Sequence, residues 1–127
     1  MRDESPHIPW DPGEMEWFLA ELIQGFTFSN GENPLVWVNT ILIRANSLDQ
    51  AYEKALKQGS LYDDTYANSN DVLVTVRFRG LRDLILIYEK LEDGAELSYT
   101  EYDDLNEEKI AAMVTPKEKL GPSLHTM

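Results

Sequence analysis

Acidic side chains concentrate in the last third of the sequence, between residues 92 and 108. The acids that could present negative charge to a partner are Asp93, Glu101, Asp103, Asp104, Glu107 and Glu108. Such a patch would attract a cationic protein. A structural interpretation is also open, because acids at 103–108 suit the positive N-terminal end of a helix dipole. A glycosidase would need two acids facing each other across a pocket, and nothing in this stretch indicates a pocket.

Three arginines, Arg77, Arg79 and Arg82, cluster in a chain that is otherwise acidic. Guanidinium groups bind carboxylates and phosphates through paired hydrogen bonds, so these residues could form an anion-binding site. Arg77 and Arg79 would share one face of a strand, because side chains alternate along a strand. Ion pairing with acids on a neighbouring strand is the simpler interpretation.

The sequence does not supply the residues that other kinds of catalytic site need. The two histidines, His7 and His125, fall in the expected tails, whereas acid–base catalysis needs a rigidly held side chain. The sequence contains no cysteine and none of the common nucleophile, zinc or phosphate-binding motifs. Asp63, Asp64 and Asp71 could hold calcium weakly, but solvated loop acids are more common. We therefore expect no catalytic residue, no metal site and no cofactor.

The overall charge limits the possible partners. The chain of 127 residues has 11 basic and 23 acidic side chains, a formal net charge of −12. This charge repels nucleic acid and anionic membranes, so we expect neither as a partner and favour a basic protein. No apolar run approaches the roughly 18 residues of a transmembrane helix, and the N-terminus lacks the apolar core of a signal peptide. With no cysteine, the composition suits a cytoplasmic protein.

The first half of the sequence predicts a long hairpin followed by a helix. Residues 16–28 and 35–45 are rich in aromatic and branched side chains, and a turn-forming cluster at 29–34 joins them. The helix is expected at 47–59, where an apolar stripe has helical spacing through Leu48, Ala51, Tyr52, Ala55 and Leu56.

The ends of this helix carry recognisable signals. Ser47 and Gln50 match a capping box, in which each side chain bonds a backbone N–H of the first turn. Gly59 is expected in a left-handed conformation just past the last turn. The narrow, alanine-rich stripe favours close packing on a sheet.

The second half predicts shorter elements. A polar loop is expected at 61–70, followed by strand segments at 72–79 and 84–89. Gly80 lies between these segments as either a bulge or a turn. An exposed strand is expected at 96–102.

Two signals mark the last elements. The Asp93–Gly94 pair predicts the hairpin turn before the exposed strand. Asp104 predicts the cap of a short helix that ends before Pro116. The expected fold is therefore α+β, with a mainly antiparallel sheet, the element order β-β-α-β-β-(β)-α, and the 47–59 helix on one sheet face.

The expected domain organisation is simple. We predict a flexible arm at 1–14, a single α+β domain at 15–115 and a tail at 116–127. Met15 directly precedes the first strand and could be an alternative translation start. One helix covers only one sheet face, so the other needs the C-terminal segment, the N-terminal arm or a second subunit. A homodimer is one hypothesis.

Four segments, taken in order, resemble a known family. They are Trp17-x-x-Ala20-x-Leu22, then Ile41-x-Ile43-x-Ala45-x-Ser47-x-x-x-Ala51-x-x-Lys54-Ala55-x-x-x-Gly59, then Phe78-x-Gly80-x-x-Asp83-Leu84, and Asp93-Gly94-x-Glu96. The chain resembles, from about residue 16 to 102, a bacterial family of short proteins known only as a domain of unknown function, the family numbered 4288. The resemblance implies a compact bacterial α+β domain and supplies no catalytic residues.

These observations favour a non-enzymatic, acidic protein-interaction module. An immunity-type inhibitor or an adaptor that binds a basic partner would fit this description. A structural or small-ligand-binding homo-oligomer is the alternative, and a hydrolase that uses carboxylates and a metal is a third possibility.

Overall fold

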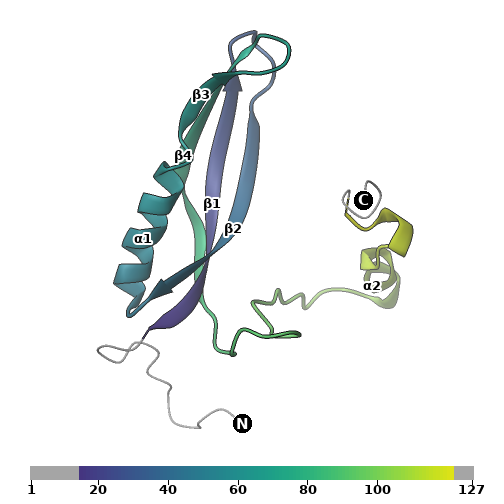
Figure 1. Ribbon diagram of the computed structural model, residues 1–127. Coiled ribbons are helices and arrows are strands. Elements are labelled where there is room, and N and C mark those ends of the chain that lie inside the picture. The colour runs from purple at the N-terminus through teal and green to yellow at the C-terminus, as the bar shows by residue number, and fades with distance from the viewer. Residues whose placement is uncertain (1–14, 122–127) are drawn as a thin grey trace.

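Strand β1 (Glu16–Phe28) is the centre of a four-stranded sheet in the computed structural model, which describes residues 15–121. Strands β2 (Leu35–Ala45) and β4 (Leu73–Leu86) pair with its two sides, both antiparallel. The short strand β3 (Asp64–Ala67) lies beyond β4, so the strand order is β2-β1-β4-β3 (Figure 1). The predicted α+β class with an antiparallel sheet is confirmed.

The β1–β2 hairpin forms over the predicted residues. Its register is unbroken from Glu16 opposite Ala45 to Phe26 opposite Leu35. The turn closes through the N–H of Gly31, which donates to the Phe28 carbonyl at 3.2 Å. Gly31 has a φ of +83°, a conformation that a residue with a side chain rarely adopts.

Helix α1 (Leu48–Ser60) packs its alanine stripe on one face of the sheet. The Ser47 hydroxyl accepts the N–H of Gln50 at 3.0 Å, so the predicted N-cap is present. The Gln50 side chain accepts the N–H of Asn46 at 2.8 Å, one residue before the partner that a capping box specifies. The buried core joins helix and sheet through Phe18, Ala20, Leu22, Ile43, Ala45, Ala51 and Ala55.

Gly59 corrects one prediction about the end of this helix. The helix continues through Gly59 to Ser60, and Leu61 is its C-cap with an ordinary right-handed φ of −66°. Gly59 is buried, and a Cβ atom there would lie 2.5 Å from the ring of Phe78. The glycine is therefore needed for the close approach of α1 to β4 and not for a left-handed turn.

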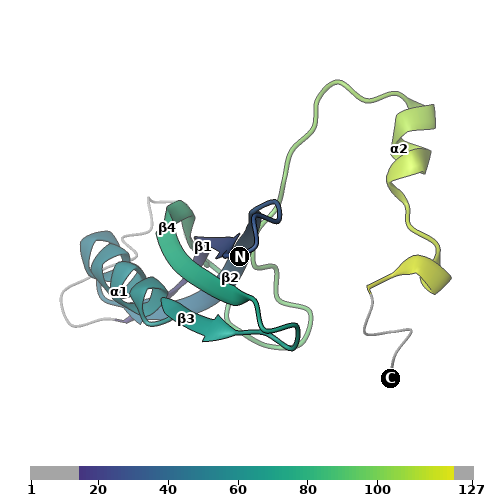
Figure 2. The ribbon, with the colours of Figure 1, turned by 90° about the horizontal axis from the view of Figure 1, so that it is seen from above.

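Strand β4 runs through Gly80 without a turn, so the two predicted segments form one strand. The register with β1 shifts twice, because Arg79 and Arg82 each have no opposite residue on β1. Gly80, with a φ of +132°, follows the first shift and marks a bulge. Bulges increase local twist, which accounts for the curl of the sheet (Figure 2).

The predictions for the polar loop and the last strand were partly wrong. The loop expected at 61–70 contains β3, a strand whose four residues are all exposed. The strand expected at 96–102 does not form. The turn at Asp93–Gly94 is present, since the N–H of Ala95 donates to the Glu92 carbonyl at 2.9 Å.

The C-terminal segment that carries the last helix leaves the sheet (Figures 1 and 2). Helix α2 (Glu107–Met113) is capped by Asn106 and not by Asp104, as the Asn106 side chain accepts the N–H of Lys109 at 2.9 Å. A single 3-10 turn, η1 (Lys117–Lys119), follows Pro116. No residue of α2 is buried, and the helix stands clear of the sheet in both views (Figures 1 and 2). Within residues 15–121, no helix has the length and apolar character needed to cross a membrane.

The sheet face opposite α1 is covered over part of its length. Leu19 and Ile87 are buried, and residues 96–99 of the segment after β4 line a cleft together with Ile85 at that end of the sheet. On this face of β2, Val36 and Val38 near the hairpin tip and Leu42 near the other end stay exposed. The expectation that one helix covers only one face is met, and the C-terminal segment supplies part of the second cover.

The expected arm at 1–14 lies outside the described residues, as do both histidines and the last six residues of the expected tail.

Candidate functional site

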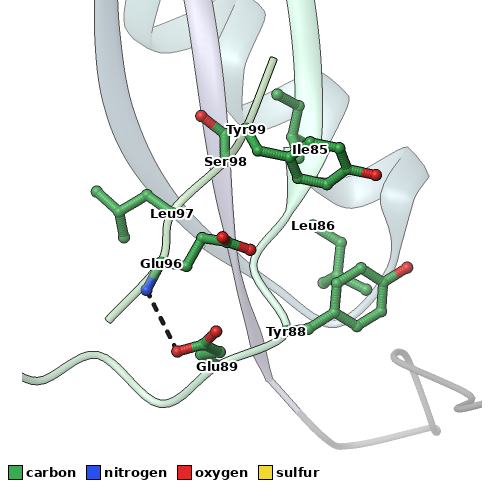
Figure 3. Close-up of a pocket in the computed structure, with 8 residues that line it drawn as sticks. All are labelled: Ile85, Leu86, Tyr88, Glu89, Glu96, Leu97, Ser98 and Tyr99. Atoms are coloured by element: carbon green, nitrogen blue, oxygen red, sulfur yellow. Dashed lines mark hydrogen bonds between the residues drawn. The ribbon is translucent and has the colours of Figure 1, made fainter. Parts of the chain in front are cut away.

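A cleft of about 150 Å³ lies between the end of β4 and the segment that returns over it. It is open to solvent, and its walls come from two stretches of chain, 85–89 and 96–99. The lining residues are Ile85, Leu86, Tyr88, Glu89, Glu96, Leu97, Ser98 and Tyr99 (Figure 3).

Two hydrogen bonds hold the walls of the cleft in place. The N–H of Ile87 donates to the Trp17 carbonyl at 2.9 Å, and the Ile87 side chain is buried, so the exit from β4 is anchored. The turn at Asp93–Gly94 then reverses the chain. The Glu89 carboxylate accepts the N–H of Glu96 at 3.2 Å and ties the outgoing and returning stretches together.

The cleft combines three kinds of surface. Ile85 and Leu86 are half-buried and form an apolar base. Tyr88 and Tyr99 contribute aromatic rings on either side, and the Glu96 side chain points between them toward β4 (Figure 3). Within residues 15–121, the Glu96 carboxylate makes no hydrogen bond or ion pair.

These groups suit a cation on a short apolar stem. Carboxylates bind ammonium and guanidinium groups through charge-assisted hydrogen bonds. Tyrosine rings attract cations over their faces, and the apolar base would contact methylene groups. The volume is smaller than the roughly 300 Å³ at which drug-sized ligand sites begin, and it matches a single long side chain.

The cleft offers little to a metal ion. In the part of the chain that the structure describes, no three or more histidine, aspartate or glutamate side chains converge on one point. Two of the three loop acids that could have held calcium accept backbone N–H groups. Asp63 accepts the N–H of Phe78 at 2.6 Å, and Asp64 accepts that of Thr65 at 2.8 Å.

The six acids singled out from the sequence are all exposed, and none of them lines the cleft. Asp93 lies in the turn, while Glu107 and Glu108 occupy the first turn of α2. Asp103 and Asp104 meet in a separate open hollow with Leu105, Asn106 and Lys109. Four of the six acids, Asp103, Asp104, Glu107 and Glu108, therefore lie at or just before the start of α2.

The three arginines differ in their surroundings. The Arg82 Nε donates to Glu21 Oε1 at 2.8 Å, which is the cross-strand pairing with an acid. This hydrogen bond holds the pKa of Glu21 below its usual value; burial opposes the shift and the positive charge of Arg82 supports it. The same bond raises the pKa of Arg82. Arg77 lies opposite Gly25, and the Arg79 side chain runs along that glycine. The anion site stays a prediction for Arg77 and Arg79.

Sequence reasoning missed Tyr88, Glu89 and Tyr99. A usable signal was present, because the residues flank the Asp93–Gly94 turn at similar distances. A reversal at that two-residue turn places Tyr88 opposite Tyr99, whereas the contact of Glu89 with the Glu96 N–H does not follow from the spacing.

A family model described as "Domain of unknown function (DUF4288)" matches residues 17–99. The match includes the sheet, α1 and all eight cleft residues, and it ends before α2. No curated protein matches the chain. No solved structure matches it either.

Proposed function

The chain belongs to the family described as a domain of unknown function, DUF4288, and we propose that it is a non-enzymatic protein-interaction module that binds a basic protein. The observation that supports this proposal is the cleft at 85–99, where two carboxylates and two tyrosine rings surround an apolar base. Its occupant is a lysine or arginine side chain of the partner.

The cleft supplies each part of such a contact. The Glu96 carboxylate bonds the cationic end of the incoming side chain, and Glu89 adds a second negative charge nearby. Tyr88 and Tyr99 flank the cation, while Ile85 and Leu86 cover its methylene stem. A chemical reaction is not part of the proposal, and among the described residues no histidine, cysteine or lysine lines the cleft.

The rest of the surface assists the encounter. A net charge of −12 raises the association rate of a basic protein, and this rate falls as salt screens the field. The exposed acids at 93–108 contribute to this net negative charge. An immunity-type inhibitor of a basic toxin and an acidic adaptor, acting in the bacterial cytoplasm, are the two forms of the proposal.

The direct test uses small probes of the expected side chains. N-acetyl-arginine amide and N-acetyl-lysine amide are titrated into the labelled protein, and amide shifts are followed by NMR. We expect saturable shifts at residues 85–99. The substitution Glu96→Gln should weaken binding about tenfold, since a hydrogen bond to a charged group contributes about 1.5–3 kcal/mol.

The matched control is Glu92→Gln, which removes the same charge from an exposed acid outside the cleft. It should leave affinity nearly unchanged. Equal losses in both variants would mean that binding is non-specific charge attraction, and shifts outside 85–99 would place the site elsewhere. Either outcome would contradict the proposal.

A further inference from the structure

Strand β2 presents a long free edge. Its inner edge pairs with β1 over eleven consecutive residues without a register shift. Within the described residues, no strand pairs with its outer edge. Edge strands usually carry a charge, a proline or a bulge that prevents pairing with another chain. From Leu35 to Ile43, β2 has none of these.

The side chains on this edge are apolar on both sheet faces. Val36 and Leu42 lie on the face opposite α1 and are 66% and 47% exposed. Leu35 and Trp37 lie on the α1 side, at 50% and 54% exposure, where the helix does not reach them. Trp37 contacts Phe26, with ring centroids 4.7 Å apart, and still leaves half of its surface in water.

We propose that β2 pairs with β2 of a second copy of this chain and so joins two sheets into one eight-stranded sheet. Charge selects this occupant. Arg44 is the one charged residue of β2, so a basic partner would find no carboxylate there. Two copies of a strongly acidic protein, in contrast, can approach along this neutral strand with the least repulsion.

A two-fold axis at Asn39 gives a self-complementary antiparallel pairing. In this register the apolar residues oppose one another across the interface, as Leu35 with Ile43, Val36 with Leu42, and Trp37 with Ile41. Opposed residues share a sheet face, because antiparallel partners always do. Arg44 lies beyond the paired apolar residues, opposite Pro34 of the second copy. The Arg44 charge of each copy therefore stays outside the buried part of the interface.

The area agrees with a stable but modest dimer. Five large apolar side chains per copy are 38–66% exposed, namely Leu35, Val36, Trp37, Val38 and Leu42. Two copies would together bury on the order of 1,000 Å², which is near the lower limit for a specific interface. The backbone bonds of the new strand pair add to this.

The test measures the mass of the full chain in solution by sedimentation velocity over a range of micromolar concentrations. The wild-type protein should dimerise. The substitution Val36→Lys should weaken dimerisation about 100-fold or more, because it places two like charges in the apolar interface. Leu61→Lys is the matched control, since Leu61 is 72% exposed and lies off β2, and it should dimerise as wild type does.

A cross-link then checks the register. The chain has no cysteine, so Val38→Cys and Thr40→Cys each carry a single thiol. These positions oppose each other in the proposed pairing, and the mixture of the two variants should form disulfide-linked dimers faster than either variant alone. A wild-type monomer, a dimer unaffected by Val36→Lys, or no excess cross-linking in the mixture would overturn the proposal. None of these results depends on the cleft at 85–99.

Discussion

Helices α1 and α2 begin in the same way and have opposite surroundings. Each starts with a side-chain cap, Ser47 for α1 and Asn106 for α2, that accepts an N–H three residues later. Helix α1 has three buried residues, whereas α2 has none. The caps therefore specify where each helix starts but not whether it packs.

Length and side-chain size explain the difference. Helix α1 has thirteen residues, and its small alanines allow the backbone to approach the sheet closely. Helix α2 has seven residues, and its larger apolar side chains, Ile110 and Met113, remain about half exposed. A helix of two turns is marginal without tertiary packing. The region 16–87 should thus unfold as one unit, and α2 should contribute little to that transition.

The largest expected effect comes from truncating the core. Leu22 is fully buried between β1 and α1, so Leu22→Ala should lower the free energy of unfolding by about 2–5 kcal/mol. In the matched variant Ile110→Ala, a similar side chain is removed from α2. Because Ile110 is 45% exposed, the free energy of unfolding should change by less than about 0.5 kcal/mol. Urea denaturation measures both. A comparable loss in Ile110→Ala would show that α2 packs on the sheet and would break the comparison.

The contact of Gly59 with Phe78 should give the next largest effect. Gly59→Ala places a Cβ atom 2.5 Å from the Phe78 ring and forces helix and strand apart, at a cost of about 1–3 kcal/mol. This cost exceeds the gain of about 1 kcal/mol from the better helix propensity of alanine. The measurement is again urea denaturation.

A rescue variant separates the clash from other causes. Adding Phe78→Leu to Gly59→Ala should recover part of the stability, because the smaller side chain leaves room for the methyl group. Gln58→Ala, an exposed change on the same turn, serves as the control for helix propensity. If Gly59→Ala alone is stabilising, the proposed close approach is wrong.

Removing the two caps should have smaller effects on stability, and it tests the comparison of the two helices directly. Ser47→Ala should destabilise the whole domain by about 1 kcal/mol, since α1 is part of the core. Asn106→Ala should leave the main unfolding transition unchanged and speed amide exchange only in α2. Amide hydrogen exchange measured by NMR distinguishes global unfolding of the domain from local opening of α2. Equal effects on the global transition would contradict the separation of the two helices.

Periodic, locally determined features could be predicted from the sequence. The limits of β1 and β2 and the start of α1 follow from alternating or helical apolar patterns with a cap at the junction. Gly59 was predicted to be needed for a left-handed turn, which was wrong. The residue must be glycine because the Phe78 ring of β4 leaves no room for a side chain. Strand β3 has four exposed residues and no apolar pattern, and it forms because the adjoining edge of β4 is free to pair.

The cleft depended on information beyond local pattern. The strand expected at 96–102 alternates correctly, but this segment returns over the sheet face and lines the cleft instead of pairing at an edge. Glu96 lay within the predicted acidic stretch, whereas Tyr88 and Glu89 lay outside it. The acidic stretch therefore overlaps the cleft only at residues 96–99, and the contact between Glu89 and Glu96 is seen only in the structure.

The smallest expected effect concerns a contact on the sheet that lies outside the core. Arg82 lowers the pKa of Glu21, so the ion pair contributes stability that is fully present above the ordinary glutamate pKa of 4.5 and is lost as the pH falls through the lowered value. The wild-type protein should have a slightly higher Tm than Glu21→Gln at about pH 7, and the difference should shrink as the pH falls below 4.5. Arg82 is exposed, so high salt should also reduce the difference. A large, salt-independent difference would mean that this pair belongs energetically with the core around Leu22, and position in the sheet would then matter more than burial.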